Sequence, residues 1–187
     1  MEGEIQLSDY FDPKLGLAVK DAYLITFVNL QCRILYRMGI GLKALVVYLS
    51  TSGNTKAMAE AIAEGITSGN VGAKAISFYD VKAEELQEAE AIAVGSSTFF
   101  YKMLPPMEKF INETLAAINP QGKIGAAFGS YGWSGEAPLL IAEKMREMGM
   151  IVLDPILLIL NTPTEEDILK CKRLGFDIAE KLKNKSK

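Results

Sequence analysis

The sequence predicts an α/β fold, a doubly wound sheet of five parallel strands with helices on both faces. Five apolar segments of strand length alternate with five segments of helical periodicity, and this alternation is typical of a parallel sheet whose crossover connections are helices. The first strand, residues 43–49, is a β-branched apolar run of the kind that is buried on both faces. With 187 residues, the chain is long enough for one such domain and an appendage. We therefore divide it into an N-terminal helical extension, residues 1–42, and a domain, residues 43–187.

Each element of the domain is predicted from its own local pattern. Asp154-Pro155 predicts a kink or an edge position in the fifth strand, because proline cannot donate to a ladder. A capping box from Thr164 to Asp167 marks the start of the last helix. The pattern leaves the strand order open. The predicted strands are 43–49, 73–79, 91–95, 123–128 and one within 150–160; the predicted helices begin at 54, 83, 105, 136 and 165; and the predicted loops after the third and fourth strands are 96–104 and 129–135.

The N-terminal extension is predicted to contain one long apolar helix. Asp12 can cap it, Pro13 suits its first position, and no strong breaker follows until Gly39. Because the helix is apolar over most of its circumference, it must be buried on several sides. It can pack on its own domain, but the domain already supplies covering helices, so we favour an interface with a partner or a second copy in a homo-oligomer. The scarcity of lysine on its polar stripe argues against a membrane surface.

A hydroxyl-rich loop follows the first strand and leads straight into a helix. The first backbone N–H groups of a helix have no internal partner, and the helix dipole places partial positive charge there. Hydroxyls can donate further hydrogen bonds to phosphate oxygens. An ordinary helix cap explains one such residue, whereas a run favours an anion site. The candidate phosphate-binding residues are Ser50, Thr51, Ser52, Gly53, Asn54 and Thr55.

The composition of this loop narrows the kind of phosphate. A nucleoside-triphosphate loop needs a lysine for the outer phosphates, but Lys56 lies beyond Thr55, inside the predicted helix. The dinucleotide fingerprint G-x-G-x-x-G is also absent. A cradle of hydroxyls without a dedicated cation suits a single phosphate monoester.

Two aromatic loops should converge beside this one, because ligands of such sheets sit at the carboxyl ends of the strands. Aromatic side chains on loops indicate a binding surface for a flat ring, although they can also cap the end of the sheet as satellite core. No glycine lies between Ser96 and Leu104, so a left-handed backbone in that loop would cost about 1–2 kcal/mol per residue. The candidate ring-binding residues are Ser97, Thr98, Phe99, Phe100 and Tyr101 of the first loop and Ser130, Tyr131, Gly132 and Trp133 of the second.

The first loop resembles the FMN-phosphate loop of flavodoxins, Ser/Thr-x-Ser/Thr-Gly-Asn-Thr, at every defining position. Residues 128–137, FGSYGWSGEA, and 103–106, MLPP, are similar to the flavodoxin module of flavodiiron proteins, also called A-type flavoproteins. The resemblance covers about residues 43–182. It implies the flavodoxin strand order 2-1-3-4-5 and an FMN cofactor held by residues 50–55, 97–101 and 130–133.

The sequence departs from the flavodiiron pattern in two places. Those proteins carry an N-terminal metallo-β-lactamase-like domain with a histidine-rich diiron site, whereas about forty residues precede the flavin module here, and the chain has no histidine. We therefore expect no reduction of oxygen or nitric oxide at iron on this chain. In the loop after the third strand, Ser97, Phe100 and Lys102 replace Pro, Asn and Gly of the family pattern S-P-T-x-N-x-G. Lys102 can face the flavin or be solvated.

Composition removes several classes of function. A net charge of −3 gives no electrostatic case for nucleic acid, and the absence of histidine excludes Ser-His-Asp and Cys-His nucleophilic sites and removes the commonest metal ligand. Two distant cysteines, no signal peptide and no apolar stretch long enough to span a bilayer indicate a cytoplasmic protein.

Three functional classes remain open. The first is an FMN-binding electron-transfer protein that serves a separate reductase, diiron or iron protein as its redox partner. The second is a flavin-dependent reductase that passes electrons from a nicotinamide or deazaflavin to a quinone or oxygen. The third is a scaffold that kept the fold and lost the flavin. We favour the electron carrier, in which the cofactor carries the chemistry and the protein tunes it.

Overall fold

The computed structural model describes residues 11–12, 17–18 and 42–185. The chain divides into two compact units, Met1–Gly41 and Leu42–Lys187. The division lies one residue before the predicted boundary between residues 42 and 43. In the part of the chain that the structure describes, no helix has the length and apolar character that a bilayer span requires.

In the first unit, two short strands pair antiparallel, β1 (Phe11–Asp12) with β2 (Leu17–Ala18). The prediction of a helix from Pro13 onward is therefore wrong at residues 17 and 18. At these residues the backbone pairs with β1, and this ladder between strands takes the place of the hydrogen bonds of a helix. The rest of the predicted helix lies outside the described residues.

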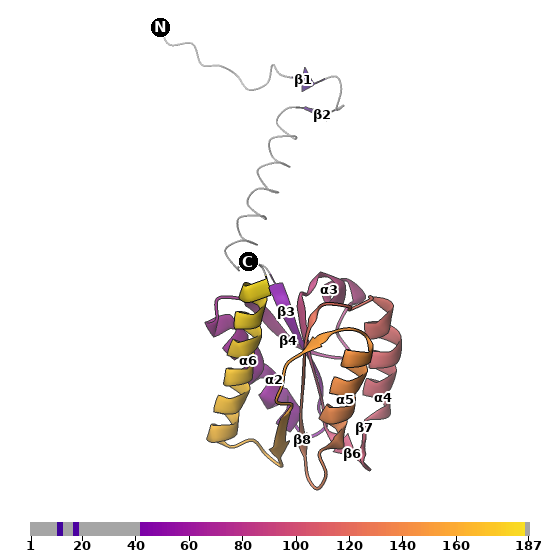
Figure 1. Ribbon diagram of the computed structural model, residues 1–187, viewed down its shortest axis with the longest axis vertical. Coiled ribbons are helices and arrows are strands. Elements are labelled where there is room, and N and C mark those ends of the chain that lie inside the picture. Colours follow the sequence, from indigo (N-terminus) through magenta and orange to yellow (C-terminus); the bar gives the residue numbers. More distant parts are fainter. Residues whose placement is uncertain (1–10, 13–16, 19–41, 186–187) are drawn as a thin grey trace. The chain divides into compact units, whose positions relative to one another are not determined.

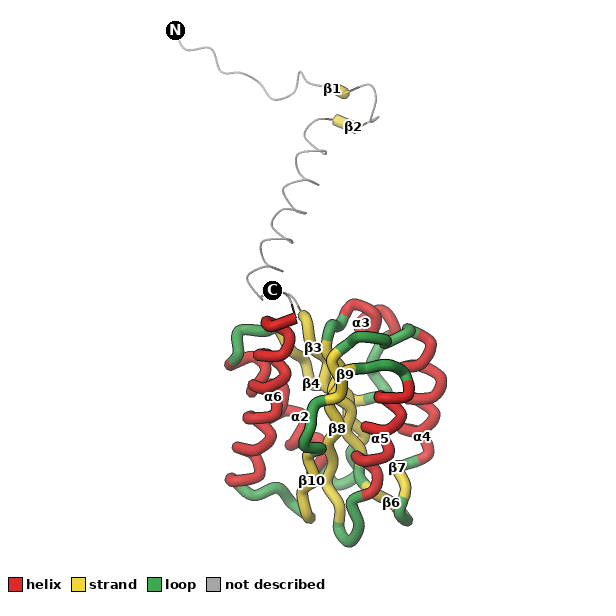
Figure 2. The backbone as a smooth tube through the Cα atoms, viewed as in Figure 1, coloured by secondary structure: helices red, strands yellow, loops and turns green. Residues whose placement is uncertain are grey.

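The second unit is built on a sheet of parallel strands (Figure 2). The order along the sheet is β4-β3-β5-β8-β10, which in chain order is 2-1-3-4-5 and confirms the order that the resemblance implied. The strands are β3 (Leu42–Leu49), β4 (Gly72–Ser77), β5 (Ala91–Ser96), β8 (Ile124–Tyr131) and β10 (Leu157–Leu160).

The edge of the sheet beyond β8 is shared by two short segments instead of one long strand. The segment β9 (Ile151–Val152) pairs with the first residues of β8, and β10 pairs with its last residues. Pro155 lies between the two segments and has no N–H to donate, so the ladder is interrupted there, as the sequence predicted. Next to Pro155, the Arg146 side chain donates hydrogen bonds of 2.8 and 3.0 Å to the Asp154 carboxylate and so ties this connection to α5.

Helices cover both faces of the sheet (Figure 1). Successive residues of a strand point to opposite faces, and in β3 Val46 packs toward the α2 and α6 side while Val47 packs toward the other. The two resulting cores make one three-layer domain. One face carries α2 (Asn54–Ser68) and α6 (Glu165–Lys185); the other carries α3 (Ala83–Glu88), α4 (Pro105–Lys109) with a π-helical segment η2 (Phe110–Leu115), and α5 (Glu136–Glu147).

The start of α6 confirms the predicted capping box. The Thr164 N–H donates to the Asp167 carboxylate at 3.1 Å, and the Asp167 N–H donates to the Thr164 hydroxyl at 3.2 Å. Each side chain thus satisfies a backbone donor that the helix leaves free.

Candidate functional site

The loop between β3 and α2 is open to an incoming anion. Gly53 has a left-handed backbone with φ of +90°, and its N–H donates to the Ser50 hydroxyl at 3.1 Å, which fixes the turn. A Cβ added at Gly53 would meet nothing within 4 Å, so there is free space over the loop. Gly53 is the N-cap residue of α2 and has no side chain with which to cap the first turn, and that turn contains no acidic residue. The first N–H groups of α2 therefore have neither a side-chain cap from the N-cap residue nor a carboxylate in their own turn, and the helix dipole places partial positive charge there.

The side chains of this loop divide into an exposed group and one buried member. Thr51, Ser52 and Gly53 are exposed, while Ser50 and Asn54 are half-buried. Thr55, in contrast, is fully buried, and its hydroxyl lies 3.2 Å from the hydroxyl of Ser130. The exposed hydroxyls can bind a ligand directly. The Thr55 hydroxyl shares a hydrogen bond with Ser130, and when Ser130 is the donor the Thr55 O–H can still donate to another group.

Ser130 lies in a strand and not, as predicted, in a loop. The strand β8 continues to Tyr131 because β10 runs beside it, with Ile159 opposite Ser130. Gly129, which was also assigned to the loop, belongs to the strand as well. The prediction ended the strand too early because this pairing partner lies about thirty residues away in the sequence.

The predicted loop 96–104 contains a small hairpin. The strand β6 (Thr98–Phe99) pairs antiparallel with β7 (Lys102–Met103). Phe100 and Tyr101 form the two-residue turn, with φ of 46° and 62°. Two successive left-handed residues define a type I′ turn, for which Asn-Gly is the favoured sequence. Aromatic residues bear a cost of about 1–2 kcal/mol each in this conformation, so the backbone cost anticipated from the sequence is present in the structure.

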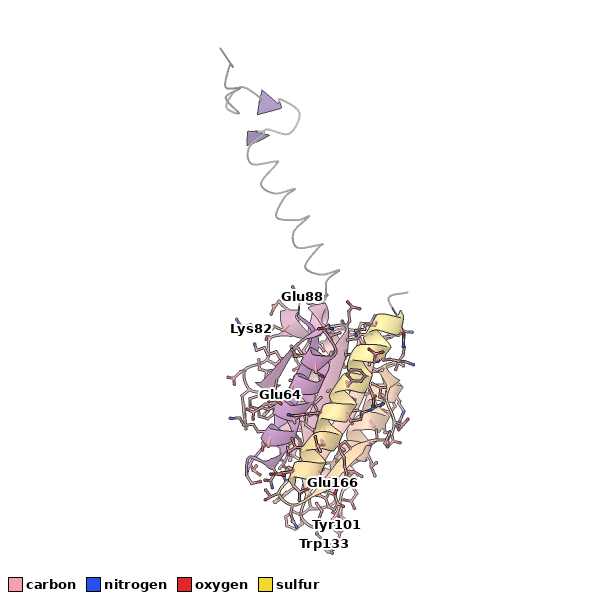
Figure 3. All side chains as sticks on the ribbon, turned by 90° about the vertical axis from the view of Figure 1, so that its left-hand side faces the viewer. Glu64, Lys82, Glu88, Tyr101, Trp133 and Glu166 are labelled. Carbon is pink, nitrogen blue, oxygen red and sulfur yellow. The ribbon has the colours of Figure 1, made fainter. Side chains whose placement is uncertain are left out.

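Contacts from two other elements hold the hairpin in place. The Thr98 hydroxyl accepts a hydrogen bond from the Ala137 N–H at the start of α5, at 3.1 Å. The Tyr101 ring meets the Trp133 ring edge-on, with 5.3 Å between their centroids. Figure 3 shows these two rings at the end of the unit that lies opposite Lys82 and Glu88. Such ring pairs contribute about 0.5–1.5 kcal/mol, which offsets part of the strain in the turn.

A cavity of about 290 Å³ lies between this hairpin and the loop after β8. Phe100 and Trp133 are among the most exposed large side chains of the described residues, at 79% and 81%. Exposed aromatic side chains that line a cavity indicate a binding surface for an apolar or aromatic ligand. The cavity is lined by Thr98, Phe99, Phe100, Tyr101, Gly132, Trp133 and Ser134.

The structure thus brings together six of the nine predicted ring-binding residues. Ser97, Ser130 and Tyr131 do not line the cavity, and neither do residues 50–55. Ser134 was missed, although it lies within the loop that the sequence marked. Lys102 is exposed, which agrees with the solvated alternative. Glu136, at the start of α5, was also missed; its Oε2 atom is buried without a hydrogen-bond partner.

The three loops follow the carboxyl ends of β3, β5 and β8, the three central strands of the sheet. In an open α/β sheet this edge is where ligands bind. A family model described as flavodoxin matches residues 46–175 of the chain. The chain belongs to the flavodoxin family.

Solved structures agree with this assignment. We call the second unit, Leu42–Lys187, the flavodoxin unit. The chain resembles the structure of a flavodoxin from the domain Archaea, with 77% sequence identity and a TM-score of 0.75, over 76% of this chain and 99% of that one. It also resembles the rubredoxin oxygen:oxidoreductase of Desulfovibrio gigas, with 31% identity and a TM-score of 0.72, over 76% of this chain and 36% of that one.

The curated relatives that match this chain are longer proteins, and the match covers only part of each. A putative diflavin flavoprotein A 3 of Synechocystis is 33% identical over 150 residues, which make up 78% of this chain and 25% of that protein. The chain spans only a quarter to about a third of the length of the first such relatives. The chain is therefore similar to the flavodoxin portion of flavodiiron proteins, and family membership supports a flavin-dependent role in electron transfer.

Proposed function

We propose that the flavodoxin unit binds FMN and carries electrons between separate redox proteins. The observation that carries this proposal is the shared edge of the sheet: an open hydroxyl-rich loop follows β3, and the loops that line an aromatic cavity follow β5 and β8, the next two strands of the sheet. One subsite fits a phosphate and the other fits a flat ring system. FMN joins these two groups in one molecule.

The phosphate would be held by neutral donors. Thr51 and Ser52 are exposed, there is free space over Gly53, and the first N–H groups of α2 follow directly after it. No lysine or arginine occurs in residues 50–55. A single phosphate monoester needs no dedicated cation when a helix terminus and several hydroxyls share its charge, which favours FMN over a nucleotide with more phosphates.

The ring would lie in the cavity between Phe100 and Trp133. Aromatic faces stack well on flat ring systems, and burying two exposed side chains against a ligand removes their apolar surface from water. No residue that lines the cavity carries a formal charge. A ring bound there would have uncharged, mainly apolar side chains against it.

When bound, FMN would supply the redox chemistry, because it can accept and release electrons one or two at a time. The chain contributes binding and orientation, and the exposure of Phe100 and Trp133 leaves one edge of the site at the protein surface. A reductase, a diiron protein or another iron protein is the kind of partner that could dock there. The name rubredoxin-oxygen oxidoreductase, given to a relative that is 33% identical over 148 residues, is in keeping with a redox partner of this kind.

The test is a flavin titration of the apoprotein. Trp133 is the only tryptophan of the chain, so quenching of its fluorescence reports on occupancy of the cavity, together with flavin absorbance. We expect FMN to bind about tenfold or more tightly than riboflavin, because charge-assisted hydrogen bonds to the phosphate add to ring binding. Absence of FMN binding, or equal affinity for FMN and riboflavin, would overturn the proposal.

A second measurement distinguishes the carrier from a flavin-dependent reductase. The FMN-loaded protein is mixed with excess NADH or reduced deazaflavin and with a quinone or oxygen. A carrier turns over slowly alone and faster when a separate reductase protein is added. Rapid turnover without any protein partner would instead identify the protein as a reductase.

A further inference from the structure

We propose that Asn161 is a positioning residue of the ring subsite, which fixes the place where the loop that carries Trp133 leaves β8. The inference rests on the proposed function and deepens it, because it names a residue outside the cavity that decides how firmly the ring is held. Asn161 is not among the residues that line the cavity. It acts on the ring through the loop that connects β8 to α5, residues 132–135.

The backbone of Asn161 anchors the end of β8. Asn161 directly follows β10, and its N–H donates a hydrogen bond of 2.7 Å to the carbonyl oxygen of Tyr131, the last residue of β8. Gly132, the next residue along the chain, already lines the cavity. The pairing of β8 with β10 is therefore extended by one bond immediately before the wall of the cavity begins, and Asn161 supplies the donor.

The side chain of Asn161 lies against the first residue of the loop. A Cβ added at Gly132 would meet the Asn161 Oδ1 atom at 3.8 Å, an ordinary van der Waals contact, and no other atom of the described residues within 4 Å apart from its chain neighbours. The backbone and the side chain of one residue thus reach two successive residues, Tyr131 and Gly132. Asn161 therefore supports the start of the loop from the end of β10.

The backbone conformation explains why an asparagine suits this position. Asn161 has a φ of 59°, in the left-handed region. Among residues that carry a β-carbon, asparagine is one of the few that adopt this conformation readily. A residue that resists it would draw the chain out of this turn and move the N–H away from Tyr131. The turn after β10 and the bond to β8 therefore depend on the same residue.

Two other contacts tie this loop to the hairpin of β6 and β7. The Trp133 side chain is 81% exposed, so core packing does not hold it, and its ring meets the Tyr101 ring of the hairpin. Where the loop enters α5, the Ala137 N–H donates to the Thr98 hydroxyl, also of the hairpin. These contacts fix the loop relative to the hairpin, whereas Asn161 fixes it relative to β10. Loosening the second support should let Trp133 shift, and small misplacements of a binding group can reduce binding severely.

This role concerns the ring and not the phosphate. In the sheet, β5 and β8 separate β10 from β3, the strand that the hydroxyl-rich loop follows. Riboflavin, which lacks the phosphate, uses the ring cavity alone. A change at Asn161 should therefore weaken the binding of FMN and of riboflavin by the same factor and leave the preference for FMN unchanged.

The experiment measures the Kd of oxidised FMN and of riboflavin for the unaltered chain and for three variants at position 161. Asn161→Ala removes the amide and resists the left-handed turn, so both Kd values should rise about tenfold, as expected for the loss of one hydrogen bond. Asn161→Gly allows the turn but has no side chain, so both should rise only about threefold. Asn161→Asp allows the turn and keeps an oxygen in the same place, so it should bind both flavins as the unaltered chain does.

The matched control is Asn70→Ala, which separates positioning from stability. Asn70 is also exposed and has a φ of 57°, but it precedes β4 and so lies at the opposite edge of the sheet. Both alanine variants lose a left-handed asparagine, so their urea midpoints of unfolding should fall alike. Only Asn161→Ala should weaken flavin binding. It should also lower the fluorescence anisotropy of Trp133 in the apoprotein, because a loosened loop lets the indole ring reorient faster.

Three results would overturn the inference while the unaltered chain still binds FMN. Unchanged flavin affinities in Asn161→Ala would show that the residue serves stability alone. A loss in Asn161→Asp as large as that in Asn161→Ala would show that the amide group itself contacts the flavin. A loss confined to FMN would place the effect at the phosphate subsite. Failure of the unaltered chain to bind FMN would instead overturn the proposed function, and the anisotropy of Trp133 would still show whether Asn161 positions the loop.

Discussion

Gly175 of α6 lies directly against Gly65 of α2. A Cβ added to Gly175 would lie 2.9 Å from the Cα of Gly65 and 2.1 Å from the carbonyl oxygen of Ile62. A Cβ added to Gly65 would lie 2.0 Å from the carbonyl oxygen of Lys172. Because these neighbours are backbone atoms, no side-chain rotation can make room. The two glycines therefore set how closely α6 approaches α2, the helix whose first turn belongs to the proposed phosphate subsite.

We expect Gly175→Ala to destabilise the protein. Alanine in the middle of a helix is ordinarily more stable than glycine by about 1 kcal/mol. Here the added methyl group must push two helices apart, and such overpacking typically costs about 1–3 kcal/mol, occasionally more. The cost of overpacking should exceed the gain in helix propensity, so the urea midpoint of unfolding should fall.

The control for this substitution is Lys181→Ala, also on α6. Lys181 is exposed, and exposed substitutions usually change the free energy of unfolding by less than about 0.5 kcal/mol. A Gly175→Ala protein as stable as the unaltered chain, or more stable, would show that the helices can separate freely.

We expect Gly129→Ala to weaken flavin binding more than it weakens the fold. A Cβ at Gly129 would lie 2.1 Å from the carbonyl oxygen of Ser96 and 2.8 Å from Pro138, at the end of β5 and β8 where the two aromatic loops begin. Displacing these ends would misplace the cavity walls, and small misplacements of a binding group can reduce binding or rate severely. Titration should show FMN and riboflavin affinity reduced by about tenfold or more, with unchanged far-ultraviolet circular dichroism.

The matched control lies in the same strand. A Cβ at Gly125 would lie 3.2 Å from the flexible end of Met145 and 3.2 Å from Val152, far from the loops. Gly125→Ala should therefore alter stability while leaving flavin affinity unchanged. Equal flavin affinity in the Gly125→Ala and Gly129→Ala proteins would contradict the idea that the strand ends position the cavity.

Local sequence patterns predicted most of the fold and the position of the hydroxyl-rich loop between β3 and α2. The run from Ser50 to Thr55 could be recognised because all its chemistry lies in six consecutive residues after an apolar strand. The capping box at Thr164 is equally local, and the structure confirms it. Features whose cause lies within one turn or one strand are the features that a single sequence reveals.

Features held by distant contacts could not be predicted. The turn at Phe100 and Tyr101 has none of the Asn-Gly chemistry that marks a type I′ hairpin, and it is supported by Trp133, about thirty residues further on. The continuation of β8 through Ser130 depends on pairing with β10. The bond from Ser130 to Thr55 crosses 75 positions, and no periodicity or motif encodes it.

The carboxyl group of Asp167 should make stability depend on pH on the acid side. The Thr164 hydroxyl and N–H, followed by the Lys170 ammonium, hold the pKa of Asp167 below its usual 3.8. A folded-state pKa below the unfolded value contributes stability above pH 3.8, and this contribution is lost as the pH falls through the folded-state pKa. Asp167→Asn should therefore be less stable than the unaltered chain at neutral pH, and the difference should shrink as the pH falls below 3.8. A difference that stays constant with pH would show that the charge of Asp167 has no part in capping α6.

The thiol of Cys171 should be unreactive in the folded protein. Burial, with a smaller effect of the nearby Asp167 carboxylate, raises the pKa of Cys171 to about 12, and the side chain is packed in the core between α6 and the sheet. The thiolate is the form that reacts with thiol reagents, and here it is scarce at neutral pH and also shielded.

In a Cys32→Ala protein, whose only thiol is Cys171, Ellman's reagent should react slowly in buffer and rapidly in urea. The rate in buffer would then report how often α6 opens from the sheet, and Gly175→Ala, which pushes α6 away from α2, should raise it. Immediate reaction of the folded protein would show that Cys171 is not held in the core.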